Sequence, residues 1–395
     1  MKYKLKDVCN FYSGTGFPTK YQGEIEGDYP FYKVGDITNN VIAGNIYLEM
    51  CNNYVSIDTV KKIKGCVLPP NTVVFAKIGE ALKLNRRAIT SCACLIDNNA
   101  MGIAPKEDTL RIQYFYFFMK NLKMQVLAES TTVPSVRKTI LEDYEVEIPS
   151  LNIQEEIESR LTIIQDIIEK RKKELSLLDN LIKARFVEMF GCIHDGRFDM
   201  KTLLEIVNDD KNSIKRGPFG GALKKEDFVE DGYLVYEQRH AIHNDFEYAK
   251  YYINQEKYED MIGFKVIPGD LIISCSGVTL GRIAEVPEGA KEGIINQALL
   301  KLSLNPHIMM NTFFIQQFRG EEIQNILFGF SRGSGIPNMP SMSEVKAVKF
   351  ICPPLELQKE YCDFVHQVDK SKVAVQKALD ETKLLFDSLM QKYFG

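Results

Sequence analysis

The sequence predicts an α+β fold, in which two similar globular domains are separated by two long helices that form an antiparallel coiled coil, with an internal pseudo-two-fold repeat. The chain has 395 residues, which is too long for one typical core. In addition, "EIPSLNIQEEI" (147–157) returns as "FICPPLELQKEY" (350–361), so that Gln154 and Gln358 lie 204 positions apart. Each of these hinges precedes about forty residues without proline or glycine. A repeated hinge predicts that the parts it joins are repeated as well.

Apolar residues recur in steps of four and three along both proline-free stretches. The pattern lasts for more than four heptads, and its polar interruptions are Arg171 and Arg185 in the first stretch and Lys372 and Thr382 in the second. A period of 3.5 residues is typical of a coiled-coil seam. The predicted seam consists of Ile157, Leu161, Ile164, Ile168, Leu175, Leu178 and Ile182 in the first helix and Tyr361, Val365, Val368, Val375, Leu379, Phe386 and Leu389 in the second.

The two helices are expected to pair with each other. At about 1.5 Å per residue each is about 60 Å long, and neither is stable alone in water with its seam exposed. Since 192–353 must bring the chain back, the pair is expected to be antiparallel. The alternative is that each helix docks only on its own domain. Ile163, Ile167, Leu177 and Leu181 widen the stripe, so the helices could bury more than one face.

The globular parts also match each other, although more loosely. "VLPPNTVVFAKIG" (67–79) parallels "VIPGDLIISCSG" (266–277), each a proline turn followed by a β-rich stretch. The stretches 112–122 and 312–327 have helical patterns. The predicted boundaries are 1–150 for the first domain, 151–191 for the first helix, 192–353 for the second domain and 354–395 for the second helix.

Composition indicates a soluble, cytoplasmic globular protein. Hydrophobic residues make up 45% and charged residues 26% of the chain, and the longest apolar stretch, "YFYFFM", is too short to cross a bilayer. The polar start of the chain has no signal-peptide pattern. The nine cysteines form no C-x-x-C pair and are expected to be reduced thiols. The pI near 5.9 does not indicate a nucleic-acid binder, but a local basic face rather than the net charge decides that question.

The domain–helix–domain–helix repeat, the hinges "IPSLNIQEEI" and "CPPLELQKEY", and the "PGDLIIS" turn with its counterpart in the other domain support one another. On these motifs the chain resembles, over its full length, the specificity subunits of type I restriction–modification systems. The first hinge departs from the pattern because it lacks the double proline. Pro149 still suits the start of a helix.

The resemblance implies two target recognition domains, each of which reads half of a split double-stranded DNA sequence. It also implies that the paired helices are a spacer that docks methyltransferase subunits, two in number, with restriction subunits as a further possible partner. The chain itself would bind no cofactor. S-adenosylmethionine, and ATP with Mg²⁺ where a restriction subunit is present, would be used by the partners in a bacterial or archaeal cytoplasm.

The residues themselves predict neither a catalytic residue nor a metal ligand. The only Pro-Pro pairs, "LPPN" and "CPPL", lack the [DNS]-P-P-[YF] pattern of adenine methyltransferases, and no G-x-x-x-x-G-K-[ST] phosphate loop is present. Glu230, Asp231 and Glu237 lack a matching acid in the other repeat and are interpreted as solvated charges. His240 and His243 are interpreted as polar loop residues, with base contact left open.

Basic residues in or beside glycine-rich loops are the candidate DNA contacts. Duplex DNA is held by phosphate contacts from lysine and arginine and read by a few side chains at base edges. Basic residues recur at matching places in both halves, which a solvated surface alone does not explain. The candidates are Lys77, Lys83, Arg86, Arg87, Arg137, Lys138, Lys215, Arg216, Arg239, Arg282 and Arg332.

Two other classes of function stay open at this point. One is a coiled-coil adaptor with two protein- or ligand-binding domains and no role with DNA, against which the paired basic loops argue. The other is a self-contained methyltransferase or nuclease with a diverged site, against which the missing motifs argue.

Overall fold

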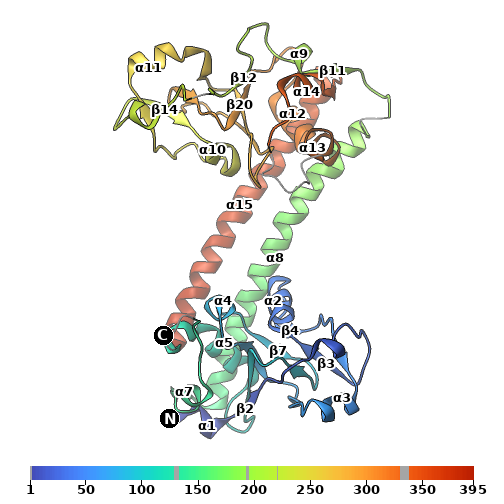
Figure 1. The fold of residues 1–395 in the computed structure, drawn as a ribbon, viewed down its shortest axis with the longest axis vertical. Coiled ribbons are helices and arrows are strands. Elements are labelled where there is room, and N and C mark those ends of the chain that lie inside the picture. Colours follow the sequence, from blue (N-terminus) through green and yellow to red (C-terminus); the bar gives the residue numbers. More distant parts are fainter. Residues whose placement is uncertain (1, 129–132, 193–194, 220, 330–337) are drawn as a thin grey trace. The chain divides into compact units, whose positions relative to one another are not determined.

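The computed structural model describes residues 2–128, 133–192, 195–219, 221–329 and 338–395. The chain divides into two compact units, Met1–Glu174 with Val375–Gly395 (unit 1) and Leu175–Ala374 (unit 2). The division runs through both long helices, which are α8 (Leu151–Phe190) and α15 (Leu355–Phe394). Each unit therefore contains one globular domain and a part of each helix (Figure 1).

Three sheets and seven short helices form the globular part of unit 1 within the described residues. The largest sheet has the order β2 (Cys9–Ser13), β9 (Ala100–Pro105), β6 (Val73–Ala76), β7 (Ala88–Thr90) and β4 (Tyr47–Leu48). The second sheet has the order β5 (Tyr54–Val55), β3 (Tyr29–Tyr32) and β8 (Leu95–Ile96), and β1 (Lys2–Lys4) pairs with β10 (Glu145–Glu147). The α-helices are α1 (Leu5–Val8), α2 (Val34–Ile42), α3 (Ile57–Lys62), α4 (Glu80–Lys83), α5 (Ile112–Asn121), α6 (Met124–Leu127) and α7 (Lys138–Glu142).

Unit 2 has the corresponding set of sheets. One has the order β12 (Ile214–Arg216), β20 (Leu299–Leu302), β17 (Leu271–Ser274) and β18 (Ile283–Glu285). Another has the order β13 (Phe228–Val229), β15 (Tyr252–Ile253), β14 (Tyr233–Tyr236), β19 (Gly293–Ile295) and β16 (Lys265–Val266), and β11 (Met200–Thr202) pairs with β21 (Lys349–Ile351). The α-helices are α9 (Leu203–Ile206), α10 (Gln238–His243), α11 (Gln255–Asp260), α12 (Asn311–Arg319), α13 (Glu321–Phe328) and α14 (Met342–Ala347).

The internal repeat is visible in the order and direction of these strands. The order β2-β9-β6-β7 corresponds to β12-β20-β17-β18, and every neighbouring pair in both is antiparallel. In the second sheets, β3 runs parallel to β8 as β14 runs parallel to β19. The α+β repeat expected from the sequence is thus confirmed at the level of topology.

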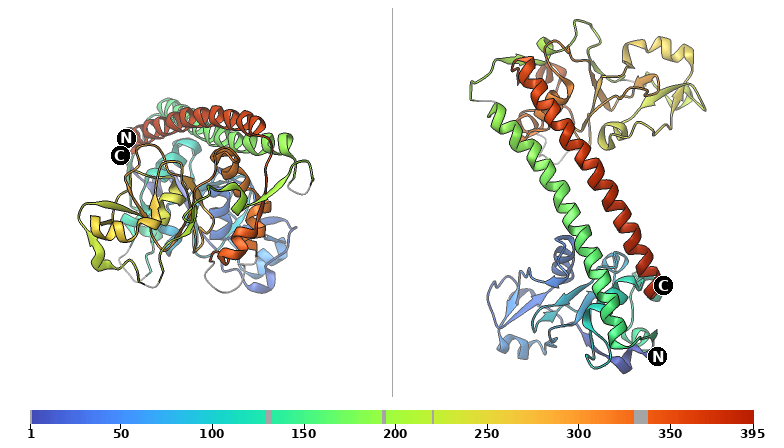
Figure 2. Two further views of the ribbon diagram at one scale, coloured as in Figure 1. Left: turned by 90° about the horizontal axis from the view of Figure 1, so that it is seen from above. Right: turned by 180° about the vertical axis from the view of Figure 1, so that it is seen from behind.

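The helices α8 and α15 pair in an antiparallel coiled coil, as expected. All the predicted seam residues are buried or half-buried, and burial follows the seven-residue step. Early residues of one helix meet late residues of the other in each unit. In unit 1 the Arg160 guanidinium donates to the Tyr393 hydroxyl over 3.3 Å, and in unit 2 Arg185 and Glu360 form an ion pair of 2.8 Å. The two helices also run alongside each other in the further views of Figure 2. No helix among the described residues is long and apolar enough to cross a membrane.

Both helices also pack on the domain of their own unit. The alternative, in which each helix docks only on its own domain, is therefore partly right. In unit 1, Phe117 of α5 packs on Phe386 with ring centroids 6.2 Å apart. In unit 2, Phe313 of α12 packs on Phe190 at 4.9 Å and on Tyr361 at 6.1 Å. Aromatic side chains therefore hold the unit 2 domain on both helices and the unit 1 domain on α15. In unit 1, α8 is joined to the domain by the ion pair of Arg111 and Glu158.

The expectation that a wider apolar stripe is buried was wrong for this chain. Ile163, Ile167, Leu177 and Leu181 are exposed, Ile163 to 59%. These residues lie outside the seven-residue seam, and α8 has no further element over them within the described units. They form part of an exposed apolar surface of the helices.

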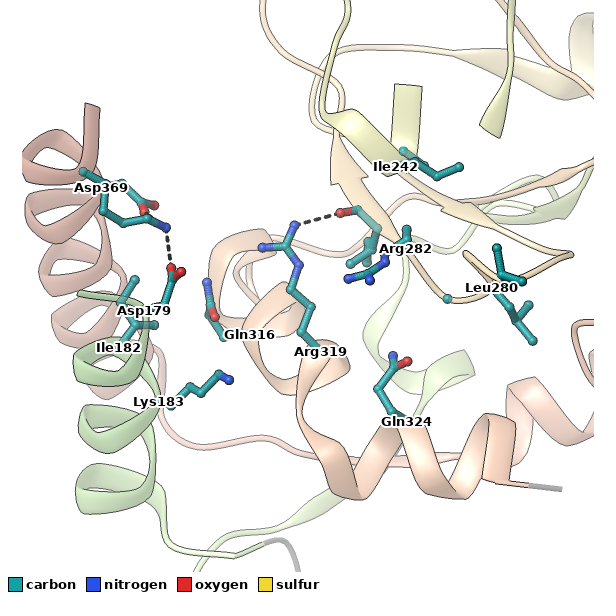
Figure 3. Close-up of a pocket in the computed structure, with 15 residues that line it drawn as sticks. Asp179, Ile182, Lys183, Ile242, Leu280, Arg282, Gln316, Arg319, Gln324 and Asp369 are labelled. Carbon is teal, nitrogen blue, oxygen red and sulfur yellow. Dashed lines mark hydrogen bonds and ion pairs between the residues drawn. The ribbon is translucent and has the colours of Figure 1, made fainter. Parts of the chain in front are cut away.

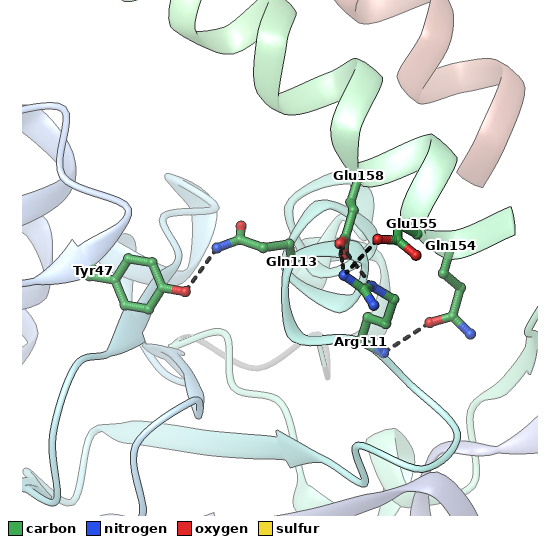
Figure 4. A network of polar contacts seen from close by, with 6 residues as sticks. All are labelled: Tyr47, Arg111, Gln113, Gln154, Glu155 and Glu158. Atoms are coloured by element: carbon green, nitrogen blue, oxygen red, sulfur yellow. Dashed lines mark hydrogen bonds and ion pairs between the residues drawn. The ribbon is translucent and has the colours of Figure 1, made fainter. Parts of the chain in front are cut away.

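The repeated hinge glutamines make the same set of hydrogen bonds in both units. Gln154 is fully buried, and its side-chain oxygen accepts from the Arg111 backbone N–H over 2.9 Å (Figure 4). Its Nε2 donates to the carbonyl oxygens of Thr109 and Pro149, each over 2.9 Å. The glutamine thus ties the start of α8 to the residues just before α5 and satisfies backbone groups that would otherwise be buried without partners.

Gln358 repeats this arrangement with the corresponding residues of unit 2. Its Oε1 accepts from the Met310 N–H, and its Nε2 donates to the carbonyl oxygens of Ile308 and Pro353, all over 2.9 Å. The hinge motif is therefore repeated because each domain needs the same clamp on its helix.

Replacing Gln358 with alanine is expected to lower the free energy of unfolding by about 1–3 kcal/mol, because three buried backbone groups lose their partner. Urea denaturation of the full chain, followed by circular dichroism, measures this change. The control is Gln367→Ala on the exposed side of the same helix, which is expected to change stability by less than about 0.5 kcal/mol. Equal effects of the two variants would contradict the clamp.

Candidate nucleic-acid interface

Loops that carry basic residues lie together at one edge of the four-stranded sheet in unit 2, where strands end or begin. Both β12 and β17 are antiparallel to β20, so they run parallel to each other and their carboxyl ends lie at the same edge. The amino end of β18 lies there too, because β18 is antiparallel to β17. This edge, called here the unit 2 edge, comprises Lys215 to Phe219 after β12 and Ser276 to Arg282 between β17 and β18.

Unit 1 builds the equivalent edge from β2, β6 and β7. The carboxyl end of β6 leads to Lys77, and the amino end of β7 is preceded by Arg86 and Arg87. Lys83 ends the short helix α4 between these two strands. The basic residues that the sequence places in separate motifs are thus brought to one sheet edge in each unit.

The segment before each hinge also joins its edge. The Val136 N–H donates to the Lys77 carbonyl oxygen, and the Gly79 N–H donates to that of Pro134, each over 2.9 Å. The Met339 N–H makes the corresponding bond to Cys275 in unit 2, also 2.9 Å. Arg137 and Lys138 therefore follow directly from the unit 1 edge. Arg332 lies outside the described residues.

The other predicted basic residues differ in their exposure and in the ion pairs that they form. Lys83, Arg137, Arg239 and Arg282 are exposed, whereas Lys77, Arg86, Lys138, Lys215 and Arg216 are half-buried. Ion pairs join Lys83 to Glu80 (2.6 Å), Lys138 to Glu142 (3.4 Å) and Arg239 to Asp245 (3.6 Å). Such surface pairs contribute little to stability and do not prevent a cation from contacting a phosphate. α10, which carries Arg239, begins beside the unit 2 edge, where Gln238 bonds Ser276 over 3.3 Å.

Arg87 is a correction to the predicted set of DNA contacts. Its side chain is only 2% exposed and its guanidinium donates to the Arg86 carbonyl oxygen (2.8 Å) and to the Asn85 side chain (2.7 Å). It also lies 4.8 Å from the centroid of the Phe75 ring. Burial lowers its pKa to about 9, so it stays positively charged at neutral pH. Arg87 therefore holds the loop in place rather than presenting its side chain at the surface.

His240 is a second correction, since base contact had been left open for it. The ring is fully buried, its Nδ1 accepts from the Glu237 N–H and its Nε2 faces the Tyr248 carbonyl oxygen, each at 2.9 Å. Both ring nitrogens are used inside the protein. His243 is exposed at the end of α10. Within the described part of the chain, no group of three or more histidine, cysteine or acidic residues could hold a metal ion.

Two apolar residues at the unit 2 edge were missed by the sequence reasoning, which searched for charge. Val278 is 98% exposed and Phe219 is 69% exposed, and the Arg216 guanidinium lies 5.7 Å from the Phe219 ring. Apolar side chains at a DNA surface can contact thymine methyl groups or base faces. Their signal in the sequence is an apolar residue next to glycine in a basic loop, "RGPFGG" and "SGVTLGR".

A family model described as the type I restriction modification DNA specificity domain matches residues 1–177 and 218–382. The chain belongs to this family. Its function is DNA sequence recognition, and an adaptor without a role in DNA recognition is not supported.

Relatives support the same assignment of this DNA specificity chain. The type I restriction enzyme MjaIX specificity subunit of Methanocaldococcus jannaschii is 20% identical over 421 residues, which cover 98% of this chain and 91% of the relative. The type I restriction–modification S subunit from M. genitalium has a TM-score of 0.57 at 15% identity and covers 100% of this chain and 96% of its own. A chain solved in work on complex assembly and conformational transition of the type I R-M system has a TM-score of 0.60 at 15% identity, with coverage of 100% and 97%. At this identity the solved structures show the shared fold.

Val278→Asp is expected to leave the free energy of unfolding within about 0.5 kcal/mol of the parent, because the Val278 side chain is 98% exposed. DNA affinity is expected to fall about tenfold or more, since a carboxylate would face phosphates. Leu204→Asp is the matched control, because Leu204 is 59% exposed on α9 and lies outside the unit 2 edge. Fluorescence anisotropy with a labelled cognate duplex measures both, and equal affinities for the two variants would contradict this interface.

Proposed function

We propose that this specificity chain reads a bipartite DNA target, with the unit 1 edge at one half-site and the unit 2 edge at the other. The observation that carries the proposal is the duplicated sheet edge, at which basic residues from two described chain segments meet in each unit. The loops at the two edges differ in sequence, as "KIGEALKLNRR" and "SGVTLGR" show. Two domains that share a fold but differ in their loops suit a target whose two half-sites differ in sequence. Lys77, Lys83, Arg86, Arg137, Lys138, Lys215, Arg216, Arg239, Arg282 and Arg332 are proposed as DNA contacts.

The exposed apolar side chains of the two helices support docking of a partner protein. In unit 1 they include Ile153, Ile163 and Leu384, and in unit 2 they include Leu177 and Val373. Exposed apolar surface of this kind is typical of a protein interaction site. We propose that methyltransferase subunits, one for each unit, dock on this surface, and that a restriction subunit joins where the system cleaves DNA.

We further propose that all chemistry belongs to these partners, in the cytoplasm of a bacterium or archaeon. The methyltransferase would bind S-adenosylmethionine and flip the target adenine out of the duplex, and a restriction subunit would use ATP and Mg²⁺. The specificity chain would bind the DNA and orient it, with no catalytic residue and no cofactor of its own.

Deleting the gene from its host tests the function directly. Single-molecule methylation sequencing is expected to show that adenine methylation disappears at one bipartite motif, because the methyltransferase is no longer placed on it. Returning the wild-type gene is expected to restore the same motif. An unchanged methylome after deletion would contradict the proposal.

Lengthening both helices by one heptad is expected to lengthen the gap of the motif. Duplicating 168–174 after Glu174 and 368–374 after Ala374 keeps the seam in register, because each duplication adds seven residues. Seven residues add about 10 Å to a helix, which corresponds to about three base pairs at about 3.4 Å each. The gap is read by methylation sequencing. As a control, a heptad added to α8 alone mismatches the pair and is expected to abolish methylation. Methylation of the original motif by the double insertion would contradict the role of the helices.

A further inference from the structure

A cavity of about 610 Å³ in unit 2 lies between the helices and the reading domain. Its walls are α8 and α15 on one side, the end of α12 on another, and the loop before β18 on a third (Figure 3). Lys183 from α8, Arg319 from α12 and Arg282 from the loop contribute cations to its lining. The last of these belongs to the unit 2 edge, so the cavity continues from the candidate DNA interface.

The lining of this cavity carries more positive charge than its own carboxylates neutralise. Both carboxylates, Asp179 and Asp369, pair with Lys372 at 2.7 and 3.4 Å. Lys183, Arg282 and Arg319 form no ion pair within the described part of the chain. Among the described residues, the Arg319 guanidinium bonds one group, the Ile283 carbonyl oxygen, over 2.9 Å. Its other N–H groups remain available to a ligand.

The pKa of Arg319 agrees with this excess of positive charge. Burial lowers it most; Asp369 and Asp179 raise it, and the nearby charge of Arg282 lowers it further. An anion between these two arginines would relieve the repulsion, and arginine binds phosphate oxygens in a bidentate geometry.

Unit 1 holds a corresponding cavity of about 290 Å³. Lys120 lies in the last turn of α5 as Arg319 lies in that of α12, and Arg87 precedes β7 as Arg282 precedes β18. The single carboxylate in its lining, Glu169, pairs with Lys172 at 2.8 Å. The half-buried Arg86 also lines this cavity and has no ion pair among the described residues. Burial lowers the pKa of Lys120, which is the direction expected for a cation that lacks a paired anion.

The recurrence of these cations decides which ligand fits. The loops that would read bases differ between the two units, whereas Lys120 and Arg319 recur at equivalent positions beside the helices. A feature shared by two domains that read different sequences suits the part of DNA that is the same everywhere, which is the phosphate backbone. In unit 1, Lys120 and Arg86 are half-buried without a paired carboxylate, which is costly unless an anion joins them.

We propose that each cavity seats a backbone phosphate of the bound DNA, and that Arg319 with Lys183 and Arg282 in unit 2, and Lys120 with Arg86 in unit 1, hold it without reading sequence. The proposal rests on the proposed function and adds to it a phosphate contact, called here the phosphate grip, that is separate from base recognition. It predicts that affinity and specificity can be lowered independently of each other.

The test measures how the affinity of the full chain, assembled with its methyltransferase subunits, depends on salt. Two duplexes serve as probes, one with the motif obtained by methylation sequencing and one with that motif scrambled. The plot of log K against log salt loses about 0.9 in slope for each phosphate contact removed. The variants are Lys183→Gln with Arg319→Gln in unit 2, and Lys120→Gln with Arg86→Gln in unit 1. Lys183→Gln alone is the variant least able to disturb folding, because Lys183 is exposed and bonds no described residue.

Each double variant is expected to lower the slope by about 0.9 on both duplexes alike and to leave the ratio of their affinities unchanged. Arg319→Lys keeps the charge and is expected to keep the slope. Lys349→Gln, an exposed cation on β21 outside the cavity, is the control for lost charge and is expected to keep it too. The proposal is overturned if a folded double variant keeps the parental slope, if the affinity ratio changes, or if Lys349→Gln lowers the slope equally. Failure of the wild-type complex to prefer the motif duplex would instead refute the proposed function.

Discussion

A 40-residue helix with an apolar stripe along one side requires a partner to stay helical in water, and the rest of this structure depends on how that partner is supplied. In each unit the stripe of α8 is covered by α15 of the same chain. Two of the polar interruptions of the seam form ion pairs across it. Arg185 pairs with Glu360, and Lys372 pairs with Asp179. Since such pairs satisfy charges in only one alignment, they fix the register and the antiparallel direction that apolar contacts alone leave loose.

The glutamine clamp, Gln154 in unit 1 and Gln358 in unit 2, holds each domain on the pair of helices. A glutamine side chain both accepts and donates, so Gln154 and Gln358 can each bond one N–H and two carbonyl groups at the hinge. Because all six bonds recur with the same geometry, each domain is held on its helix in the same way. The sheet edge of each unit is then presented by an identical support, and its loops are free to differ.

Features that depend on a local sequence pattern, such as the seam and the repeat, were predictable from the sequence. The seam follows from a heptad period, and the repeat follows from two hinges at one offset, so the fold class and the paired helices were predicted, whereas the strand order was not. Burial decided by distant residues was not predictable. Arg86 and Arg87 are adjacent, and the second is buried, where it contacts the Phe75 ring and the Asn85 side chain. The role of Gln154 was hidden for the same reason, since two of its three partners, Arg111 and Thr109, lie more than forty positions before it. Apolar periodicity also predicts burial without saying whether the covering surface belongs to the same chain, as the exposed Ile163 shows.

The two repeats contain two kinds of residue, those that recur at equivalent positions and those present in one repeat only. Residues that recur, such as the clamp glutamines and the cations Lys120 and Arg319, must serve what both half-sites have in common. Residues present in one repeat only, such as Phe219 and Val278, are free to serve what differs. Since the DNA backbone is common to all sequences and base edges are not, the first group supports and grips while the second can discriminate. Duplication thus lets one chain change either half of its target through loops alone, because the seam, the clamp and the phosphate grip do not depend on them.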